Sequence, residues 1–119
     1  MPAITPITPI TPITPTYHVS PQLDPREVAA IAAAGYRTLV CMRPDGEAFG
    51  QPAWAAVEAE AKKHGLQTHY IPAQSGAVTP AQAAQLKQVL AQAPGKVLAY
   101  CASGNRCALA YQMARQLPD

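Results

Sequence analysis

Residues 96–106 read KVLAYCASGNR, and this stretch decides the predicted fold. Its first five residues are mostly apolar and follow the Pro94-Gly95 pair, which is typical of a buried strand. The pattern after Arg106 is helical. A cysteine placed where a strand gives way to a helix lies among unpaired backbone N–H groups, at the positive end of a helix dipole. Cys101 is therefore the candidate nucleophile.

Strands and helices alternate outward from this stretch. Strands are predicted at residues 17–20, 37–42, 68–71 and 96–100, and helices at residues 25–34, 52–64, 80–92 and 107–117. Asp24 and Thr79 are the predicted caps of two of these helices, and Leu109, Met113 and Leu117 are the predicted inner stripe of the last. Helices between strands imply right-handed crossovers. The predicted class is α/β, with a mostly parallel sheet of four to five strands and helices on both faces.

Composition narrows the function classes. The 119 residues are 49% hydrophobic, which is enough for one domain with a core. Nine Lys and Arg against seven Asp and Glu, with no basic run, disfavour nucleic acid and favour a small anion as the partner. The chain shows no leader pattern or membrane span, and its three cysteines lack metal-ligand spacing. We expect a cytoplasmic protein with free thiols, no cofactor, no metal and no membrane contact.

The N-terminal segment has its own pattern, because residues 4–15 repeat Ile-Thr-Pro four times. A proline at every third position removes backbone donors and excludes both a helix and a central strand. Residues 1–16 are therefore predicted to be an extended or disordered tail ahead of a domain at residues 17–119. The period of three aligns the isoleucines, so self-association through the tail is one hypothesis and a simple spacer is the other.

The segment from Cys101 to Arg106 has the composition of an anion-binding loop. The residues whose backbone amides are predicted to line it are Ala102, Ser103, Gly104 and Asn105. Glycine lets the amides turn inward, and the arginine supplies a bidentate fork for a tetrahedral anion. Several amides, a helix terminus and one cation together can hold a thiol as the thiolate at neutral pH. The alternative is a small, buried and inert cysteine.

A second loop, RPDGE at residues 43–47, also follows a predicted strand. Ligands of such sheets bind at the carboxyl ends of the strands, so the two loops should share one site. Asp45 is a tentative catalytic acid, although Arg-Pro-Asp-Gly is also a turn sequence. Arg43 assists anion binding, pairs with a carboxylate of this loop, or lies on the surface.

These residues resemble a known family. The similarity is carried by AAGYRT (33–38), RPDGE (43–47), GQP (50–52) and CASGNR (101–106), and it spans about residues 17–117. The family is the phosphatase-like domain, once a domain of unknown function, that occurs alone or fused to β-lactamase-like persulfide dioxygenases. The resemblance implies a fold like that of dual-specificity phosphatases and a cysteine enzyme, regarded either as a phosphatase or as a rhodanese-like sulfurtransferase.

Three departures from cysteine phosphatases favour sulfur transfer. Phosphatases place five residues between cysteine and arginine, whereas this chain has four, as rhodaneses do. The usual flanking His and Ser or Thr are replaced by Tyr100 and Cys107. No Asp or Glu occurs at residues 61–118 to protonate a leaving alkoxide, so that only Asp45 or Glu47 could serve, whereas sulfite leaving from thiosulfate needs no acid.

The primary hypothesis is therefore a sulfurtransferase that forms a Cys101 persulfide from thiosulfate or another sulfane sulfur donor. A phosphatase that acts on a phosphoester through a Cys101 phosphocysteine, with Asp45 as acid, is the second hypothesis. A non-catalytic oxyanion-binding or redox-sensing module is the third. Cys107 could replace a hydroxyl residue, donate weakly to the thiolate, or resolve an oxidised Cys101 as a disulfide.

Overall fold

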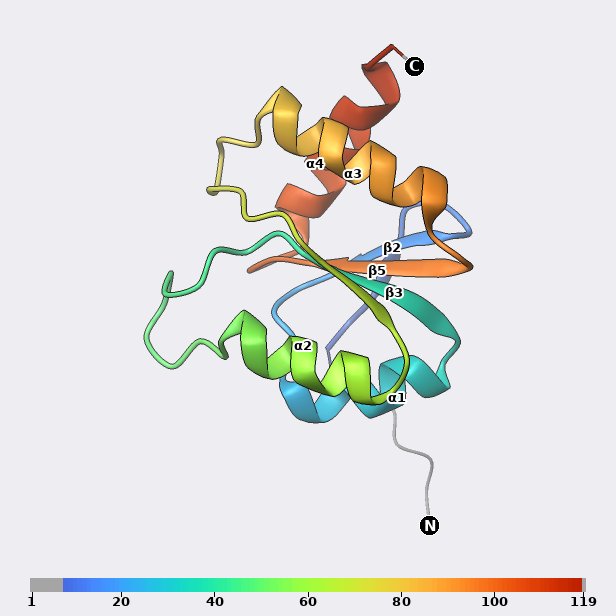
Figure 1. Cartoon of the computed structure of the whole chain (residues 1–119). Coiled ribbons are helices and arrows are strands. Elements are labelled where there is room, and N and C mark those ends of the chain that lie inside the picture. Colours follow the sequence, from blue (N-terminus) through green and yellow to red (C-terminus); the bar gives the residue numbers. More distant parts are fainter. Residues whose placement is uncertain (1–7, 119) are drawn as a thin grey trace.

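The computed structural model describes residues 8–118, and Figure 1 shows a sheet between two layers of helices. The strands are β1 (Thr11–Pro12), β2 (Tyr17–Ser20), β3 (Tyr36–Cys41), β4 (Gln67–Tyr70) and β5 (Lys96–Tyr100). Their spatial order is β1-β2-β5-β3-β4. All neighbouring pairs are parallel except β1 with β2. The α/β class with a mostly parallel sheet is confirmed.

The helices are η1 (Pro25–Glu27, a 3-10 turn), α1 (Val28–Ala33), α2 (Trp54–Lys63), α3 (Pro80–Gln92) and α4 (Asn105–Gln116). In Figure 1, α1 and α2 cover one face of the sheet, and α3 and α4 cover the other. The connections through these helices return the chain so that β2, β5, β3 and β4 run parallel, with their carboxyl ends at the same end of the sheet. The carboxyl ends of β3 and β5 consequently lie next to each other.

Local sequence explains where these helices begin. The Asp24 carboxylate accepts a hydrogen bond from the Arg26 amide in a capping box with Glu27, and Pro25 occupies the first turn. Thr79 and Gln82 form the same reciprocal arrangement at the start of α3. Both predicted caps are confirmed. Such caps satisfy amides that would otherwise lack partners in the first turn of a helix.

The alternation of side chains along the strands builds two separate cores. Val97 and Ala99 of β5 pack with α3 and α4, whereas Leu98 and Tyr100 pack with α1 and α2. Cys101 continues this alternation and belongs to the core on the α3 and α4 face. The position of the candidate nucleophile thus follows from the period of two of its own strand.

The start and the inner face of α4 differ from the prediction. The helix begins at Asn105, two residues earlier than expected, because Gly104 adopts a φ of 92° and acts as its N-cap. Of the predicted stripe, Leu109 is wrong because it is exposed, and Met113 and Leu117 are only partly buried. The buried positions are Arg106, Cys107, Ala110 and Ala114. Small side chains let α4 approach α3 and the sheet closely, which hydrophobicity alone does not indicate.

Part of the predicted tail lies against the domain. Thr11–Pro12 pairs with β2 at the sheet edge, where a proline is tolerated. Ile10 packs on the core beneath α1 and α2, and Thr8 hydrogen-bonds to the Glu27 carboxylate through its amide and its hydroxyl. The boundary after residue 16 and self-association through the repeat stay predictions. Residues 1–7, which include the start of the repeat, lie outside the described residues.

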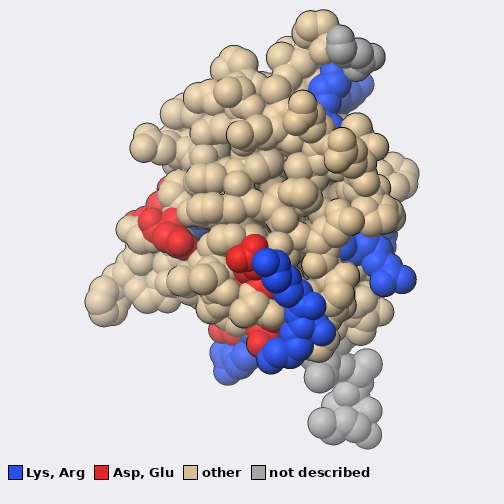
Figure 2. Space-filling view, viewed as in Figure 1, with Lys and Arg blue, Asp and Glu red and all other residues tan. Residues whose placement is uncertain are grey.

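Charged side chains are sparse and mixed in sign on the face seen in Figure 2. On α2, Lys62 pairs with Glu58 and Lys63 with Glu60. Within residues 8–118, no helix combines the length and the apolar character that crossing a membrane would require. The same residues contain no cluster of His, Cys, Asp and Glu suited to a metal ion.

Candidate active site

The candidate active site is built around the short turn between β5 and α4. Gly104 makes this turn possible, because its φ of 92° lies in the left-handed region that side chains disfavour. A Cβ at Gly104 would also lie 3.4 Å from the backbone carbonyl group of Ser20 on the neighbouring strand. The turn therefore curls tightly, and the amides that follow Cys101 face its sulfur.

Cys101 is the most strongly activated group of this site. Its Sγ accepts a hydrogen bond from the Gly104 amide at 3.0 Å. A hydrogen bond from the Cys107 thiol, helped by the backbone amides of Cys107, Ser103 and Arg106, outweighs burial and lowers the pKa of Cys101 to about 5. Cys101 is therefore a thiolate at neutral pH, as a nucleophile requires.

Cys107 is the donor that makes this possible. Its side chain is fully buried in the first turn of α4, and burial together with the Cys101 sulfur raises its pKa well above the ordinary value. Its thiol thus remains protonated beside the thiolate. The Tyr17 hydroxyl donates to the Cys107 carbonyl at 2.9 Å, which holds this turn against β2. Of the predicted roles for Cys107, hydrogen-bond donation is the one that fits the lowered pKa of Cys101.

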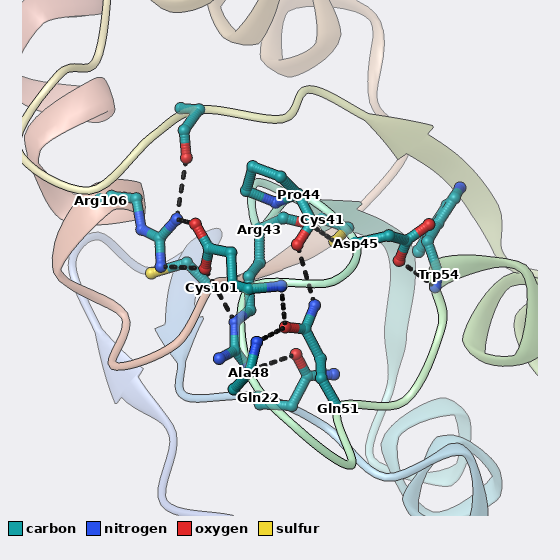
Figure 3. Close-up of polar contacts among 12 residues, drawn as sticks. Gln22, Cys41, Arg43, Pro44, Asp45, Ala48, Gln51, Trp54, Cys101 and Arg106 are labelled. Carbon is teal, nitrogen blue, oxygen red and sulfur yellow. Dashed lines mark hydrogen bonds and ion pairs between the residues drawn. The ribbon is translucent and has the colours of Figure 1, made fainter.

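Arg106 lies at the centre of a charged network (Figure 3). Its Nη1 and Nη2 donate to the two carboxylate oxygens of Glu47 at 2.7 and 2.9 Å, and Nη1 also donates to the Ala73 carbonyl at 2.8 Å. The hydrogen bonds to Glu47 are the main cause that raises the pKa of Arg106 and lowers the pKa of Glu47. Both groups remain charged at neutral pH.

Arg43 joins the same network from the end of β3. Its Nε donates to Glu47 Oε1 at 3.0 Å, and its Nη1 donates to the Gln22 side-chain oxygen at 3.0 Å. Of its predicted roles, pairing with a carboxylate of its own loop is the one the geometry shows. The structure thus brings the RPDGE loop to the cysteine loop, as the strand-end argument predicted.

Glu47 is the residue that sequence reasoning undervalued. The sequence predicts Glu47 as a spare acid and as a partner of Arg43, but it does not predict the pairing with Arg106. These two residues are 59 positions apart in the chain, and no local pattern links them. The only signal was their presence in two loops that follow strands, which predicts proximity without giving the pairing.

Asp45 lies apart from the thiolate. Its Oδ1 accepts a hydrogen bond from the Trp54 amide at 2.8 Å, and its own amide donates to the Tyr70 hydroxyl at 3.1 Å. Figure 3 shows the Asp45 carboxylate beside Trp54 and well separated from Cys101. It caps α2 from outside that helix, since Ala53 at the N-cap has no side-chain hydrogen bond to offer. Its predicted role as catalytic acid stays a prediction.

The remaining loop residues form the rim. The side chains of Ala102, Ser103 and Asn105 are exposed, and the Asn105 amide donates to the Ser103 hydroxyl at 3.3 Å. The Cys101 sulfur beneath them is fully buried. A substrate therefore reaches it only when neighbouring groups part. Amide lining, an arginine and a buried thiolate form a site suited to nucleophilic attack on a small anion.

Residues 10–117 match the family described as the phosphatase-like domain of beta-lactamase hydrolase-like protein. The beta-lactamase hydrolase-like protein of Xylella fastidiosa strain Temecula1 is 32% identical over 96 residues, covering 81% of this chain and 22% of that protein. The chain thus spans about a fifth of the length of this relative.

Solved structures agree with this match. A "putative phosphatase" from Neisseria meningitidis is 30% identical, with a TM-score of 0.81 over 92% of this chain and 80% of that one. The P. aeruginosa protein TpbA, determined with pTyr, has a TM-score of 0.67 at 21% identity over 99% of this chain and 70% of that one, and it shares the fold. The cysteine-phosphatase-like architecture predicted for the sheet is therefore confirmed, and the chain belongs to the phosphatase-like domain family of the beta-lactamase hydrolase-like proteins.

Proposed function

We propose that this domain is a cysteine-dependent sulfurtransferase. The Cys101 thiolate attacks the outer sulfur of thiosulfate, the sulfur–sulfur bond of the donor breaks, and sulfite leaves with the bonding electrons. Cys101 then carries the sulfur as a persulfide. Cyanide or a thiol attacks the terminal sulfur, takes it away and restores the thiolate. The backbone amides and Arg106 bind the anionic donor.

The observation that supports this proposal is that, within residues 8–118, the site contains a thiolate but no carboxyl group placed to donate a proton to a leaving group. The pKa of Glu47 is lowered, mainly by its hydrogen bonds to Arg106, so this carboxylate is a poor proton donor at neutral pH. The Asp45 carboxylate is engaged at the start of α2. An alkoxide leaving from a phosphate ester needs a proton, whereas sulfite leaves as a stable anion. The site therefore suits a donor whose leaving group is already stable.

Phosphoester hydrolysis is the second candidate, and similarity supports it. The Neisseria meningitidis protein is named a "putative phosphatase". The structure of TpbA was determined in complex with pTyr. In this reaction Cys101 would attack phosphorus and form a phosphocysteine, the ester oxygen would leave with a proton from Asp45, and water would release phosphate. For this to occur, Asp45 would have to leave the Trp54 amide.

A parallel assay separates the candidates. Purified protein is treated with thiosulfate and analysed by intact mass and peptide mass spectrometry, and a second sample is given a chromogenic phosphate ester. We expect one added sulfur on Cys101, removed by cyanide with release of thiocyanate, and none in Cys101→Ser. Cys41→Ser is the matched control and should still gain sulfur. Phosphate release without any persulfide would contradict the proposal and favour the phosphatase.

A binding or redox-sensing module is the third possibility. A pKa of Cys101 near its ordinary value, with neither reaction, would leave only this role. The lowered pKa of Cys101 supports an enzyme instead. The three free cysteines suit a reducing compartment, so the proposal places the protein in the cytoplasm.

A further inference from the structure

Three of the N–H groups of Arg106 donate to protein oxygens, and the other two lie along one edge of the guanidinium. A guanidinium carries five N–H donors in one plane. Glu47 and the Ala73 carbonyl take both donors of Nη1 and one of Nη2. Among residues 8–118, no oxygen acceptor contacts the other two N–H groups, on Nε and Nη2. These two point in parallel from the side edge of the plane, the geometry of a fork for two oxygens of one anion.

The edge without an oxygen acceptor lies at the reaction centre, where the guanidinium also interacts with the Cys101 sulfur. The Cys101 sulfur contributes, after Glu47, to raising the pKa of Arg106, and Figure 3 shows the sulfur beside the guanidinium. An oxyanion held by Nε and Nη2 would therefore be presented to the thiolate. An arginine side chain has several rotatable bonds, so the orientation of this edge depends on the group that binds the other N–H donors of the guanidinium, which here is mainly Glu47.

Glu47 is itself held by a braced loop. Gln51 accepts hydrogen bonds from the Glu47 and Ala48 amides through its side-chain oxygen and donates through its nitrogen to the Pro44 carbonyl. Arg43 Nε holds Glu47 Oε1 from a second side. The Glu47 side chain is about a quarter exposed, whereas Arg106 is buried. The carboxylate is thus a fixed partner of the arginine rather than a freely moving surface group.

We propose that Glu47 is a positioning residue that presents the Nε and Nη2 edge of Arg106 to the oxyanion of the substrate. Glu47 does not touch the reacting atoms and acts only through Arg106. The inference deepens the proposed sulfur transfer and rests on it for the identity of the donor. The same placement would serve a phosphate anion, so anion binding can be measured apart from turnover.

Protection of Cys101 by sulfate tests this role. Sulfate is an unreactive analogue of thiosulfate, and iodoacetamide is a neutral alkylating agent that marks Cys101, read by peptide mass spectrometry. We expect sulfate to slow alkylation of the wild type. Glu47→Gln should need roughly tenfold more sulfate for half protection, because a charge-assisted hydrogen-bond pair that orients the arginine is lost. Glu47→Asp, which keeps the charge, should lie between the two.

Two controls separate positioning from general damage. Glu60→Gln removes an exposed carboxylate that pairs with Lys63 on α2, and it should leave protection unchanged. The alkylation rate without sulfate is measured for each variant, and each protection curve is normalised to that rate, so that a change in the reactivity of Cys101 is separated from a change in sulfate binding. A thermal melt establishes that each variant is folded.

The remaining outcomes overturn the inference. Equal or tighter sulfate protection in Glu47→Gln would mean that Glu47 competes with the anion instead of positioning its arginine. Absence of protection in the wild type would mean that the free edge of Arg106 is not an anion seat. Protection that depends on Glu47, with no persulfide formed from thiosulfate, would refute the proposed function and retain the role of Glu47.

Discussion

The ends of β3 and β5 lie side by side in the sheet, and each carries a buried cysteine in a different chemical state. Cys41 is the last residue of β3 and pairs in register with Tyr100, and Cys101 follows one residue later. Cys41 is 2% exposed and Cys101 is fully buried. Burial raises the pKa of the Cys41 thiol, whereas hydrogen bonds lower the pKa of Cys101 to about 5.

The difference teaches that burial alone does not activate a thiol. Cys41 faces the core beneath α1 and α2, where its thiol donates to the Arg43 carbonyl at 3.3 Å. Cys101 faces the opposite core and meets the amides at the start of α4. At Cys41 burial outweighs the hydrogen bonds and the pKa rises, whereas at Cys101 the hydrogen bonds from Cys107 and the loop amides outweigh burial and the pKa falls. The cysteine at the end of β3 is therefore a protonated core residue, whereas the cysteine at the end of β5 is a thiolate.

The largest expected effect is in the pH dependence of alkylation at the two cysteines. The labelling rate of Cys101 should have its midpoint near pH 5 and fall about tenfold per pH unit below it, because the protonated thiol does not react. Labelling of Cys41 should still be rising above pH 9. Peptide mass spectrometry assigns each site. Because both cysteines are buried, the frequency at which each site opens scales its alkylation rate but does not change the pH midpoint of that rate. The same midpoint for Cys101 and Cys41 would contradict the proposed difference between them.

A smaller effect is expected when the donor to the thiolate is removed. Cys107→Ala should raise the pKa of Cys101 by about one unit, equivalent to roughly 1.4 kcal/mol, because the thiolate loses its strongest single hydrogen bond. The alkylation midpoint measures the shift. Cys107→Ser restores a donor and should keep the midpoint close to that of the wild type. Equal midpoints in all three proteins would show that the amides suffice without Cys107.

The smallest effect is expected at Asp45, in the loop that follows β3. Asp45→Asn keeps an acceptor for the Trp54 amide and should leave persulfide formation within about twofold of the wild type. Asp45→Ala loses the cap and should lower the free energy of unfolding by about 1 kcal/mol, measured by denaturant titration. A loss of phosphate-ester turnover of roughly tenfold or more in Asp45→Asn would instead identify Asp45 as the acid of the phosphatase.

Much of the fold was predictable because its signals are local. Thr79 with Gln82 three residues later marks the start of α3, and the apolar residues between Gly95 and Cys101 mark β5. The stripe of α4 was not predictable from hydrophobicity. Leu109 has the larger apolar side chain, yet Ala110 is buried because the space beside α3 and the sheet admits only a small residue.

The sequence by itself identified Cys101 as the candidate nucleophile, Arg106 as its candidate partner and the end of the sheet at which both lie. These conclusions needed only the period of the strands, the spacing from Cys101 to Arg106 and the rule that parallel strands end together. Tertiary structure alone decided that Glu47 pairs with Arg106, that Asp45 caps α2 and that Cys107 donates to the thiolate. The physical reason is that hydrogen bonds depend on distance and direction in space, and residues far apart in sequence acquire both only when the sheet is assembled.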